Sequence, residues 1–506
     1  MIKNKLVYLI SALILVFGLL GVIQGQPKTV QAAGKTVIYN LYATDGWQTL
    51  ADGTTLYTYG FVGGREGESL TFAKSSQDGK PAGNVTLPKG APSPTGGKMT
   101  KEEEVFLGNA QFPAPVIYAS VGDIVEIRLK NLGVSAQDAP NDPHSIHLHG
   151  IDVDAANDGV PETSIGAVPV PLGDIEESGE GHDVSQGEGN VVVYMFSPKN
   201  PGTYMYHCHQ EADIHVQMGM YGALIIYNTD DEAAQSGPGS GKGGKLWGWH
   251  YDKDYILLLS EVDTGQHDSE LYSYNPPYNP VDYKPQYWFI NGLSFPNTVH
   301  VGLNWNDWIA GHKGYDPFIV GSISKNHPNT TVTKGEKVLL RVINMGFETQ
   351  PMHMHGFHGK IIGSDQRAWP WANDPMKTVF GEGLEKNTLT IGSGETYEWL
   401  LDFGQQSMAT SKYPPNANGM PPSVYSGGTQ SRYTDAGPTS NTTQDKVIPM
   451  PGTDPQSTYT GGPAVTGLHD TPMNGQLFPF HNHDDYKATN DGTYPGGMFT
   501  MIETLP

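Results

Sequence analysis

Residues Tyr204–Met220 read YMYHCHQEADIHVQMGM and contain Cys208, the only cysteine of the 506-residue chain. This thiol therefore cannot form an internal disulfide. It lies between two histidines, and a further histidine and a methionine follow it. A thiolate, imidazoles and a thioether are together the donors that suit copper. Taken alone, the stretch also allows a second interpretation, a buried structural cysteine between two surface histidines.

The period of a β-strand gives this stretch two functional faces. Its aromatic and β-branched residues favour a strand over Thr203–His209. Side chains of a strand alternate between faces, so His207 and His209 point one way and Cys208 points the other. One segment therefore serves two metal sites.

Three more histidine pairs share this spacing. The four pairs are His147/His149 and His207/His209 in the first half of the chain, and His353/His355 and His481/His483 in the second. Within each pair the two imidazoles lie on the same strand face. Eight imidazoles are too many for one ion and suit a cluster of three.

The mononuclear site is predicted by the same alternation. His144 lies three residues before His147 and therefore faces away from that pair, as Cys208 faces away from its own flanking histidines. We expect His144, Cys208 and His215 to converge on one copper ion, with a methionine as the weak axial ligand. Met220, after Gly219, is preferred over Met218.

An internal repeat predicts two homologous domains. Residues 121–133 (VGDIVEIRLKNLG) resemble residues 333–346 (TKGEKVLLRVINMG), and a histidine pair follows each copy. Short alternating runs between Gly- and Pro-rich turns indicate an all-β fold of sandwiches. We expect a first domain at 34–234, a linker at 235–246 and a second domain at 247–506. A polar insertion at about 404–475 interrupts the second domain.

The N-terminal residues predict where the protein is found, and the net charge narrows the classes of ligand it can bind. Two lysines, an apolar run from Leu6 to Ile23 and small residues near Ala33 describe a signal peptide at 1–33, so the protein is expected to be secreted or on the cell surface. An uncleaved membrane anchor is the alternative. The formal net charge of −23 and the absence of a basic cluster argue against nucleic acid and favour cationic substrates.

These residues resemble the multicopper oxidases. His144–Gly150 is similar to that family's H-x-x-H-x-H-G motif, and His207–Met220 to its H-C-H…H…G-M motif, with two extra residues between Cys208 and His215. The resemblance implies two cupredoxin-like Greek-key β-sandwich domains and four copper ions per chain. It also implies a laccase-like oxidase that oxidises a donor one electron at a time and reduces dioxygen to water.

The resemblance assigns each ligand to one of three copper types. Type 1 copper takes His144, Cys208, His215 and Met220. Type 2 copper takes His147 and His353. The pair of type 3 coppers takes the remaining six histidines: His149, His207, His209, His355, His481 and His483. In the second repeat, Gln350 and Asn482 stand where the first has His144 and Cys208, so we expect no type 1 copper there.

This arrangement resembles the two-domain oxidases with type 1 copper in the first domain. In that group three identical subunits place the trinuclear site between the first domain of one and the second domain of its neighbour, and we expect the same homotrimer here. A degenerate middle domain within 247–320 would instead allow a monomer. Copper nitrite reductase and a non-catalytic copper electron carrier are the alternative functions.

The resemblance also suggests a proton donor and a range of reductants. Asp158 is similar to the family's acidic residue in the loop after His149, and Asp154 is the alternative. Either residue can instead be a turn residue. We expect phenols, aromatic amines or low-valent metal ions as electron donors, with dioxygen as the acceptor.

Overall fold

The computed structural model describes residues 34–75, 83–170, 190–299, 305–326, 333–370, 383–405 and 476–505. The predicted signal peptide at 1–33 lies outside these residues, as does the polar insertion from residue 406 onward. In the described ranges, no helix has the length and apolarity that crossing a membrane requires.

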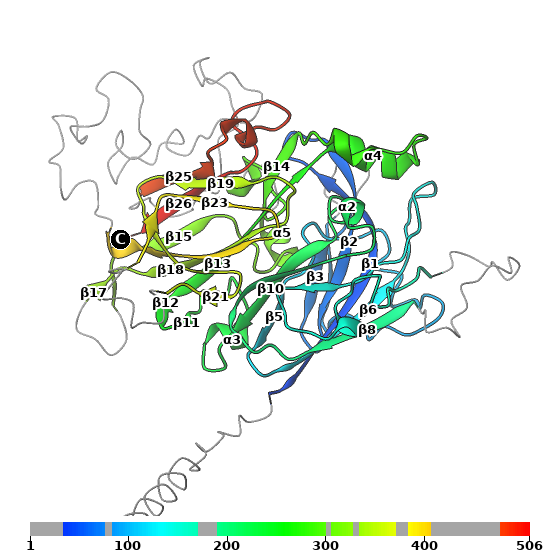
Figure 1. Cartoon of the computed structure of the whole chain (residues 1–506), viewed down its shortest axis with the longest axis horizontal. Helices are drawn as coiled ribbons and strands as arrows, with labels where there is room; N and C mark the ends of the chain where they lie inside the picture. Colours follow the sequence, from blue (N-terminus) through cyan, green and yellow to red (C-terminus); the bar gives the residue numbers. More distant parts are fainter. Residues whose placement is uncertain are drawn as a thin grey trace, which may run out of the picture. The chain divides into compact units, whose positions relative to one another are not determined.

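The first sandwich is built from two four-stranded sheets (Figure 1). The first sheet has the order β2 (Thr55–Arg65), β1 (Thr36–Thr49), β6 (Ile124–Asn131) and β8 (Val191–Phe196). The second has the order β5 (Ile117–Ser120), β10 (Tyr221–Tyr227), β9 (Gly202–His207) and β7 (His147–His149). The stretch analysed first, Tyr204–Met220, therefore begins within strand β9 and ends directly before β10.

The second sandwich repeats this arrangement. One sheet has the order β14 (Tyr287–Ile290), β13 (Lys253–Val262), β18 (Lys337–Asn344), β24 (Thr396–Asp402), β20 (Gly359–Ser364) and β21 (Arg367–Ala368), with β22 (Glu385–Lys386) also on β20. The other has the order β15 (Ile319–Ser322), β26 (Phe499–Leu505), β25 (Gln476–Asn482), β19 (Gln350–Met354) and β23 (Thr388–Ile391). The prediction of an all-β fold with two cupredoxin-like Greek-key sandwiches is confirmed.

The remaining elements are short. Two-stranded ribbons are formed by β3 (Leu70–Ala73) with β4 (Asn84–Leu87), β11 (Gly244–Leu246) with β12 (Trp249–Tyr251), and β16 (Lys325–Asn326) with β17 (Thr333–Lys334). The described α-helices are α2 (Ala212–His215), α3 (Ala233–Ser236), α4 (Thr264–Tyr272) and α5 (Trp305–Gly311). The 3₁₀ turns are η1 (Ala155–Asn157), η3 (Pro280–Asp282), η4 (Asn297–Val299), η5 (Phe403–Gln405) and η8 (Asp485–Ala488).

The two copies of the sequence repeat occupy equivalent places. Strand β6 is parallel to β1 and antiparallel to β8, and β18 is likewise parallel to β13 and antiparallel to β24. The asparagine that ends each strand has the same role. Asn131 donates from Nδ2 to the carbonyl oxygen of Asp142 at 2.8 Å, and Asn344 donates to that of Glu348 at 2.8 Å. Asp142 and Glu348 are therefore equivalent positions.

Apolar side chains fill each sandwich and the contact between the two. One cluster fills the first sandwich and includes Cys208 and Met220, and another fills the second. A further cluster joins Tyr221 and Ile225 on β10 to Ile256 on β13.

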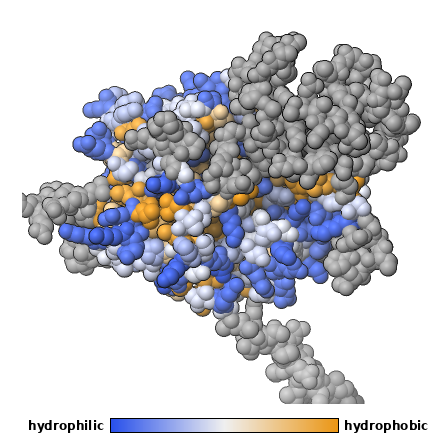
Figure 2. Space-filling model, turned by 180° about the vertical axis from the view of Figure 1, so that it is seen from behind, coloured by the Kyte–Doolittle hydropathy of each residue, from blue (hydrophilic) through white to orange (hydrophobic). Residues whose placement is uncertain are grey.

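Polar and apolar side chains share the surface, and Figure 2 shows hydrophobic groups among hydrophilic ones on one face. In the range 247–320, the longer described strands β13, β14 and β15 all belong to the second sandwich.

A buried carboxyl group lies at the contact between the sandwiches. Glu398 on β24 accepts a hydrogen bond at Oε1 from the backbone N–H of Thr203 on β9, at 2.9 Å, and Oε2 has no partner. Burial raises the pKa of Glu398 to about 7, although the Thr203 hydrogen bond and Arg341 oppose the shift. The folded protein therefore holds this proton at a pH where the unfolded chain has released it.

This shift predicts a pH-dependent stability. Because the pKa rises from 4.5 to about 7 on folding, the free energy of unfolding falls as the pH rises through that interval, by up to about 3 kcal/mol. Glu398→Gln keeps a hydrogen-bond acceptor but cannot titrate. The fall in the free energy of unfolding that Glu398 causes between these two pH values should therefore vanish in this variant. Denaturant unfolding at about pH 4.5 and about pH 7.5 measures it. The exposed Glu102→Gln is the control, and equal slopes in all three proteins contradict the prediction.

Candidate metal centres

Three side chains converge where β9 runs into the following loop. Cys208 Sγ lies 3.4 Å from Nδ1 of His215 and 3.9 Å from Nδ1 of His144. The candidate ligand atoms of the three residues all lie within 4.8 Å of one another. All three side chains are buried, as is Met220. The predicted mononuclear set is therefore brought together.

Backbone hydrogen bonds hold this site in place. The Cys208 N–H donates to the carbonyl oxygen of Met220 at 2.9 Å, and the Met220 N–H donates to that of His215 at 3.0 Å. The Ser145 N–H approaches Cys208 Sγ at 3.4 Å, so it can stabilise a thiolate. The same residue receives a hydrogen bond at Oγ from the N–H of His209. Ser145 thus links the two faces of the Cys208 segment.

The surroundings shift the pKa values of the two histidines of this site in opposite directions. Burial lowers the pKa of His144 well below its usual value, and His215 adds to the effect. Burial also opposes the charged form of His215. The Cys208 sulfur and the Asp142 carboxylate outweigh it and raise the pKa of His215 to about 10. Burial therefore favours the neutral form of His144, whereas His215 has the Cys208 sulfur 3.4 Å from Nδ1 and the Asp142 carboxylate 4.0 Å from Nε2.

Four histidines form a quartet on the opposite side of the Cys208 segment. His147 is directly opposite His207 in the β7–β9 pairing. The ring centroid of His147 lies 5.7 Å from that of His149, 5.0 Å from that of His207 and 5.2 Å from that of His209. Burial lowers the pKa of His207 to about 3, which keeps its imidazole neutral and able to bind a metal.

The second sandwich carries an equivalent quartet. His353 is opposite His481 in the β19–β25 pairing, and its ring centroid lies 5.0 Å from those of His355 and His483. Nε2 of His355 approaches Nε2 of His481 at 3.2 Å. This quartet is more open to solvent, since His355 and His483 are exposed. In the described part of the chain, no ring contact joins the two quartets.

Several quartet histidines have one ring nitrogen already bonded to the protein. Nδ1 of His147 donates to the carbonyl oxygen of Asp158 at 2.7 Å. Nδ1 of His207 donates to the carbonyl oxygen of Cys208, and Nδ1 of His481 to that of Asn482, both at 2.9 Å. A hydrogen bond at Nδ1 fixes the tautomer and leaves Nε2 free for a metal. This donor set fits copper.

The structure also places the two candidate acidic residues. Asp158 has Oδ1 at 3.3 Å from Nδ1 of His147, so its carboxylate lies beside the first quartet. Asp154 instead caps η1, where Oδ1 accepts from the N–H of Ala156 and the side chain of Asn157. The role of Asp158 as a proton donor remains a prediction.

Two details of the local structure differ from the strand argument. Strand β9 ends at His207, and Cys208 and His209 follow it. His144 lies outside a strand and forms an isolated bridge with Ala167. The alternation of faces nevertheless persists, because Cys208 remains hydrogen-bonded to Met220, the residue just before β10.

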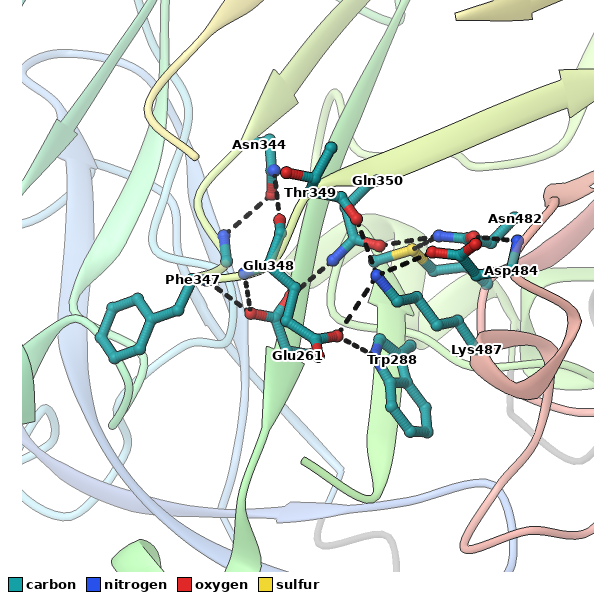
Figure 3. Close-up of polar contacts among 12 residues, drawn as sticks. Glu261, Trp288, Asn344, Phe347, Glu348, Thr349, Gln350, Asn482, Asp484 and Lys487 are labelled. Carbon is teal, nitrogen blue, oxygen red and sulfur yellow. Dashed lines mark hydrogen bonds and ion pairs between the residues drawn. The ribbon is translucent and has the colours of Figure 1, made fainter. Parts of the chain in front are cut away.

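The second sandwich has a polar network at the position of the mononuclear site (Figure 3). Gln350 donates from Nε2 to Oε2 of Glu261 at 2.7 Å and accepts at Oε1 from Asn482 at 2.7 Å. Asn482 also donates to Sδ of Met498 at 3.4 Å. Burial raises the pKa of Glu261 to about 7. Amide groups thus stand where the first sandwich has the Cys208 sulfur and the His144 imidazole, and the lack of type 1 copper in this sandwich stays a prediction.

Sequence reasoning missed several residues around these centres. Ser145 and Thr388 hold ligands in place, and Thr388 Oγ1 lies 2.7 Å from Nδ1 of His353. Asp142 and Glu211 flank the buried His215 and form with it a second group of possible metal ligands. The position of Asp142 two residues before His144 was an available signal, but sequence alone does not place it beside His215.

Comparisons with known proteins show which family and which relatives the chain resembles. A family model described as multicopper oxidase matches residues 88–230 and 282–405. Copper resistance protein A of Escherichia coli is 28% identical over 179 residues, 33% of this chain and 22% of that protein. The multicopper oxidase MmcO of Mycobacterium tuberculosis is 24% identical over 291 residues, 57% of this chain and 46% of that protein. The chain therefore spans less than half the length of these relatives.

Solved structures also match. A blue copper oxidase from Nitrosomonas europaea aligns with a TM-score of 0.48 and 19% identity, covering 93% of this chain and 86% of that one.

The mononuclear site predicts a selective loss of copper. Cys208→Ser should remove the thiolate-to-copper absorption and about one copper ion per chain, because a hydroxyl is a poor ligand for this ion. The quartets should keep their copper, since Cys208 faces away from them. Met218→Leu is the control, because it conserves apolar volume beside the site. Metal analysis and the visible spectrum measure both, and a blue Cys208→Ser protein contradicts the assignment.

Proposed function

Because the chain belongs to the multicopper oxidase family, we propose that it is an exported, laccase-like oxidase that reduces dioxygen to water. Its electron donors are phenolic or aromatic compounds or low-valent metal ions, oxidised one electron at a time. The observation that carries this proposal is the position of Cys208, whose side chain belongs to the mononuclear site while its two neighbours belong to a histidine quartet.

The chain's own residues define the proposed roles. The type 1 ion would be held by His144, Cys208, His215 and Met220, and the type 2 ion by His147 and His353. The type 3 ions would be held by His149, His207, His209, His355, His481 and His483. Bound copper would supply the one-electron steps and the dioxygen chemistry. Cys208 is the direct neighbour of His207 and His209 in the chain. The backbone at this point therefore joins the mononuclear site to the first histidine quartet covalently.

Assembly completes the proposed cluster. We propose a homotrimer in which the first quartet of one subunit meets the second quartet of its neighbour. The lack of a ring contact between the quartets within the described chain supports this arrangement. Val193 and Met195 on β8 are exposed. The Met195 N–H donates to Oδ1 of Asn157, a residue of η1, so these apolar residues lie beside η1. Apolar residues are therefore available next to the first quartet for a subunit contact.

Export is proposed from the sequence pattern at residues 1–33.

Copper content and oxygen stoichiometry test the oxidase itself. The oxidase should hold about four copper ions per chain and consume one dioxygen for about four electrons, whereas a nitrite reductase would hold about two and an electron carrier about one. A blue protein that binds one copper and takes up no oxygen contradicts the proposal.

Mixing two inactive variants tests the proposed assembly. His149→Ala disables the first quartet and His355→Ala the second, so each variant alone should be inactive. In mixed trimers assembled at random, about a quarter of the sites would combine an intact quartet of each kind and regain activity. Oxygen uptake after dissociation and reassembly measures this recovery. A cluster formed within one chain gives no recovery, and that result contradicts assembly between subunits.

Asp158 is proposed to supply protons near His147. Asp158→Asn keeps a hydrogen-bonding side chain but cannot donate an acidic proton. Turnover should fall roughly a hundredfold, the usual contribution of a positioned acid, and its pH dependence should change. The Asp154→Asn variant, which alters only the cap of η1, should keep the pH profile of the wild type. Steady-state oxygen uptake across pH measures both, and an unchanged Asp158→Asn profile removes this residue from the mechanism.

A further inference from the structure

The loop between two ligands of the mononuclear site is attached to the second sandwich. Gln217 lies between His215 and Met220, and its side chain is buried. Its Oε1 accepts from the N–H of Asp263 at 2.9 Å, and its Nε2 donates to the carbonyl oxygen of Glu261 at 3.0 Å. Residues at the end of strand β13 and directly after it therefore hold the ligand loop.

A tyrosine connects this loop to a buried carboxylate. Nε2 of Gln217 also donates to the Tyr283 hydroxyl at 3.0 Å, and that hydroxyl donates to Oε1 of Glu261 at 3.2 Å. The same oxygen accepts from the backbone N–H groups of Phe347 and Glu348. The hydrogen-bond donors that start at the ligand loop therefore end on Glu261.

The other oxygen of Glu261 leads to the second quartet (Figure 3). Oε2 accepts from Nε2 of Gln350 at 2.7 Å, and Oε1 of Gln350 accepts from Nδ2 of Asn482 at 2.7 Å. The carbonyl oxygen of Asn482 accepts from Nδ1 of His481 at 2.9 Å, and the next residue is His483. Donors therefore converge on Glu261 from the sides of both metal centres.

The space around Glu261 fits a carboxylate and nothing larger. Gly346 lies against it, and a Cβ at this glycine would overlap the carboxylate oxygens. The Glu261 side chain is buried, so its four protein donors, rather than water, satisfy it. A buried carboxylate bonded in this way is held in one orientation and holds its partners in turn.

The first sandwich has a shorter acid at the equivalent position. In the β1–β6 pairing, the partner of Asn131 lies two residues before Asp45. In the β13–β18 pairing, the partner of Asn344 likewise lies two residues before Glu261. Asp45 also accepts from two backbone N–H groups of the loop after β6, at 2.8 and 2.9 Å. The additional methylene group of Glu261 lets its carboxylate reach further, to the Gln350 side chain.

We propose that Glu261 is a positioning residue for the ligands of both metal centres. Through Gln217 it fixes the loop that carries two ligands of the mononuclear site. Through Gln350 and Asn482 it fixes the segment that carries two histidines of the second quartet. Groups behind metal ligands orient those ligands and tune the metal. The inference rests on the proposed assignment of copper to both centres, and it gives the polar network of the second sandwich a role in them.

Glu261→Gln tests this role, because an amide has one acceptor oxygen and one of the donors that point at residue 261 must lose its partner. In the copper-loaded protein, the visible absorption of the mononuclear copper should shift. The affinity for the remaining copper, measured by competition with a chelator, should fall about tenfold. Glu398→Gln changes another buried glutamate of the second sandwich, outside the network, and should leave both quantities unchanged. Equal effects of the two variants overturn the proposal.

Two further variants separate the two links. Gln217→Met cuts the link to the mononuclear loop and should change only the visible spectrum and the reduction potential of the blue copper. Gln350→Met cuts the link to the second quartet and should lower only the affinity for the remaining copper, about tenfold. Methionine keeps a similar length and volume in both places. If both variants lose the same properties, the effect is general destabilisation and the proposal is wrong.

A reciprocal exchange distinguishes positioning from general damage. In Glu261→Gln/Gln350→Glu the acid and the amide change places, so the amide N–H at 261 can donate to the carboxylate at 350, which still accepts from Asn482. This double variant should regain the spectrum and copper affinity of the wild type, and failure to improve on Glu261→Gln contradicts the proposal. A copper-loaded wild type without blue absorption refutes the copper assignment itself, whereas a blue wild type with unchanged variants refutes only the role of Glu261.

Discussion

The structure depends on one backbone constraint, that a single extended segment presents Cys208 to one site and its two neighbours to another. The constraint is geometric, since successive side chains of an extended chain point to opposite faces. Main-chain hydrogen bonds on both sides hold the segment, with Met220 bonded to Cys208 on one side and Ser145 to His209 on the other. A slip of one residue would send the thiol into the quartet and both imidazoles into the apolar core.

The two sandwiches have the same arrangement of strands but carry different side chains at one equivalent position. The first sandwich keeps a buried thiol among imidazoles, and the second fills that position with Gln350, Asn482 and Glu261. Buried polar groups cost stability unless their hydrogen bonds are satisfied. The amides therefore bond to each other and to Glu261, which also accepts from the backbone N–H groups of Phe347 and Glu348. The second sandwich thus replaces a metal centre with a closed polar network while its histidine quartet stays in place.

Local sequence patterns predicted much of this fold and site. The alternating runs at 123–129 and 337–343 are strands β6 and β18, and all four histidine pairs form quartets, because period and spacing are properties of nearby residues. The contacts of Glu398 with Thr203 and of Asp142 with His215 were not predictable, since they join segments distant in sequence. Their partners are set by how the loops and sandwiches pack, which no single stretch encodes.

The division of faces at Cys208 also separates two kinds of surroundings. On the His215 side, the carboxylates of Asp142 and Glu211 lie at the surface and the imidazole behind them is buried. On the other side, the imidazoles of the quartet are neutral because burial and neighbouring rings disfavour their protonation. A neutral imidazole is the form that binds a metal ion. The same chain segment therefore gives the mononuclear site and the first quartet different surroundings, although Cys208 and the two quartet histidines beside it are adjacent in the sequence.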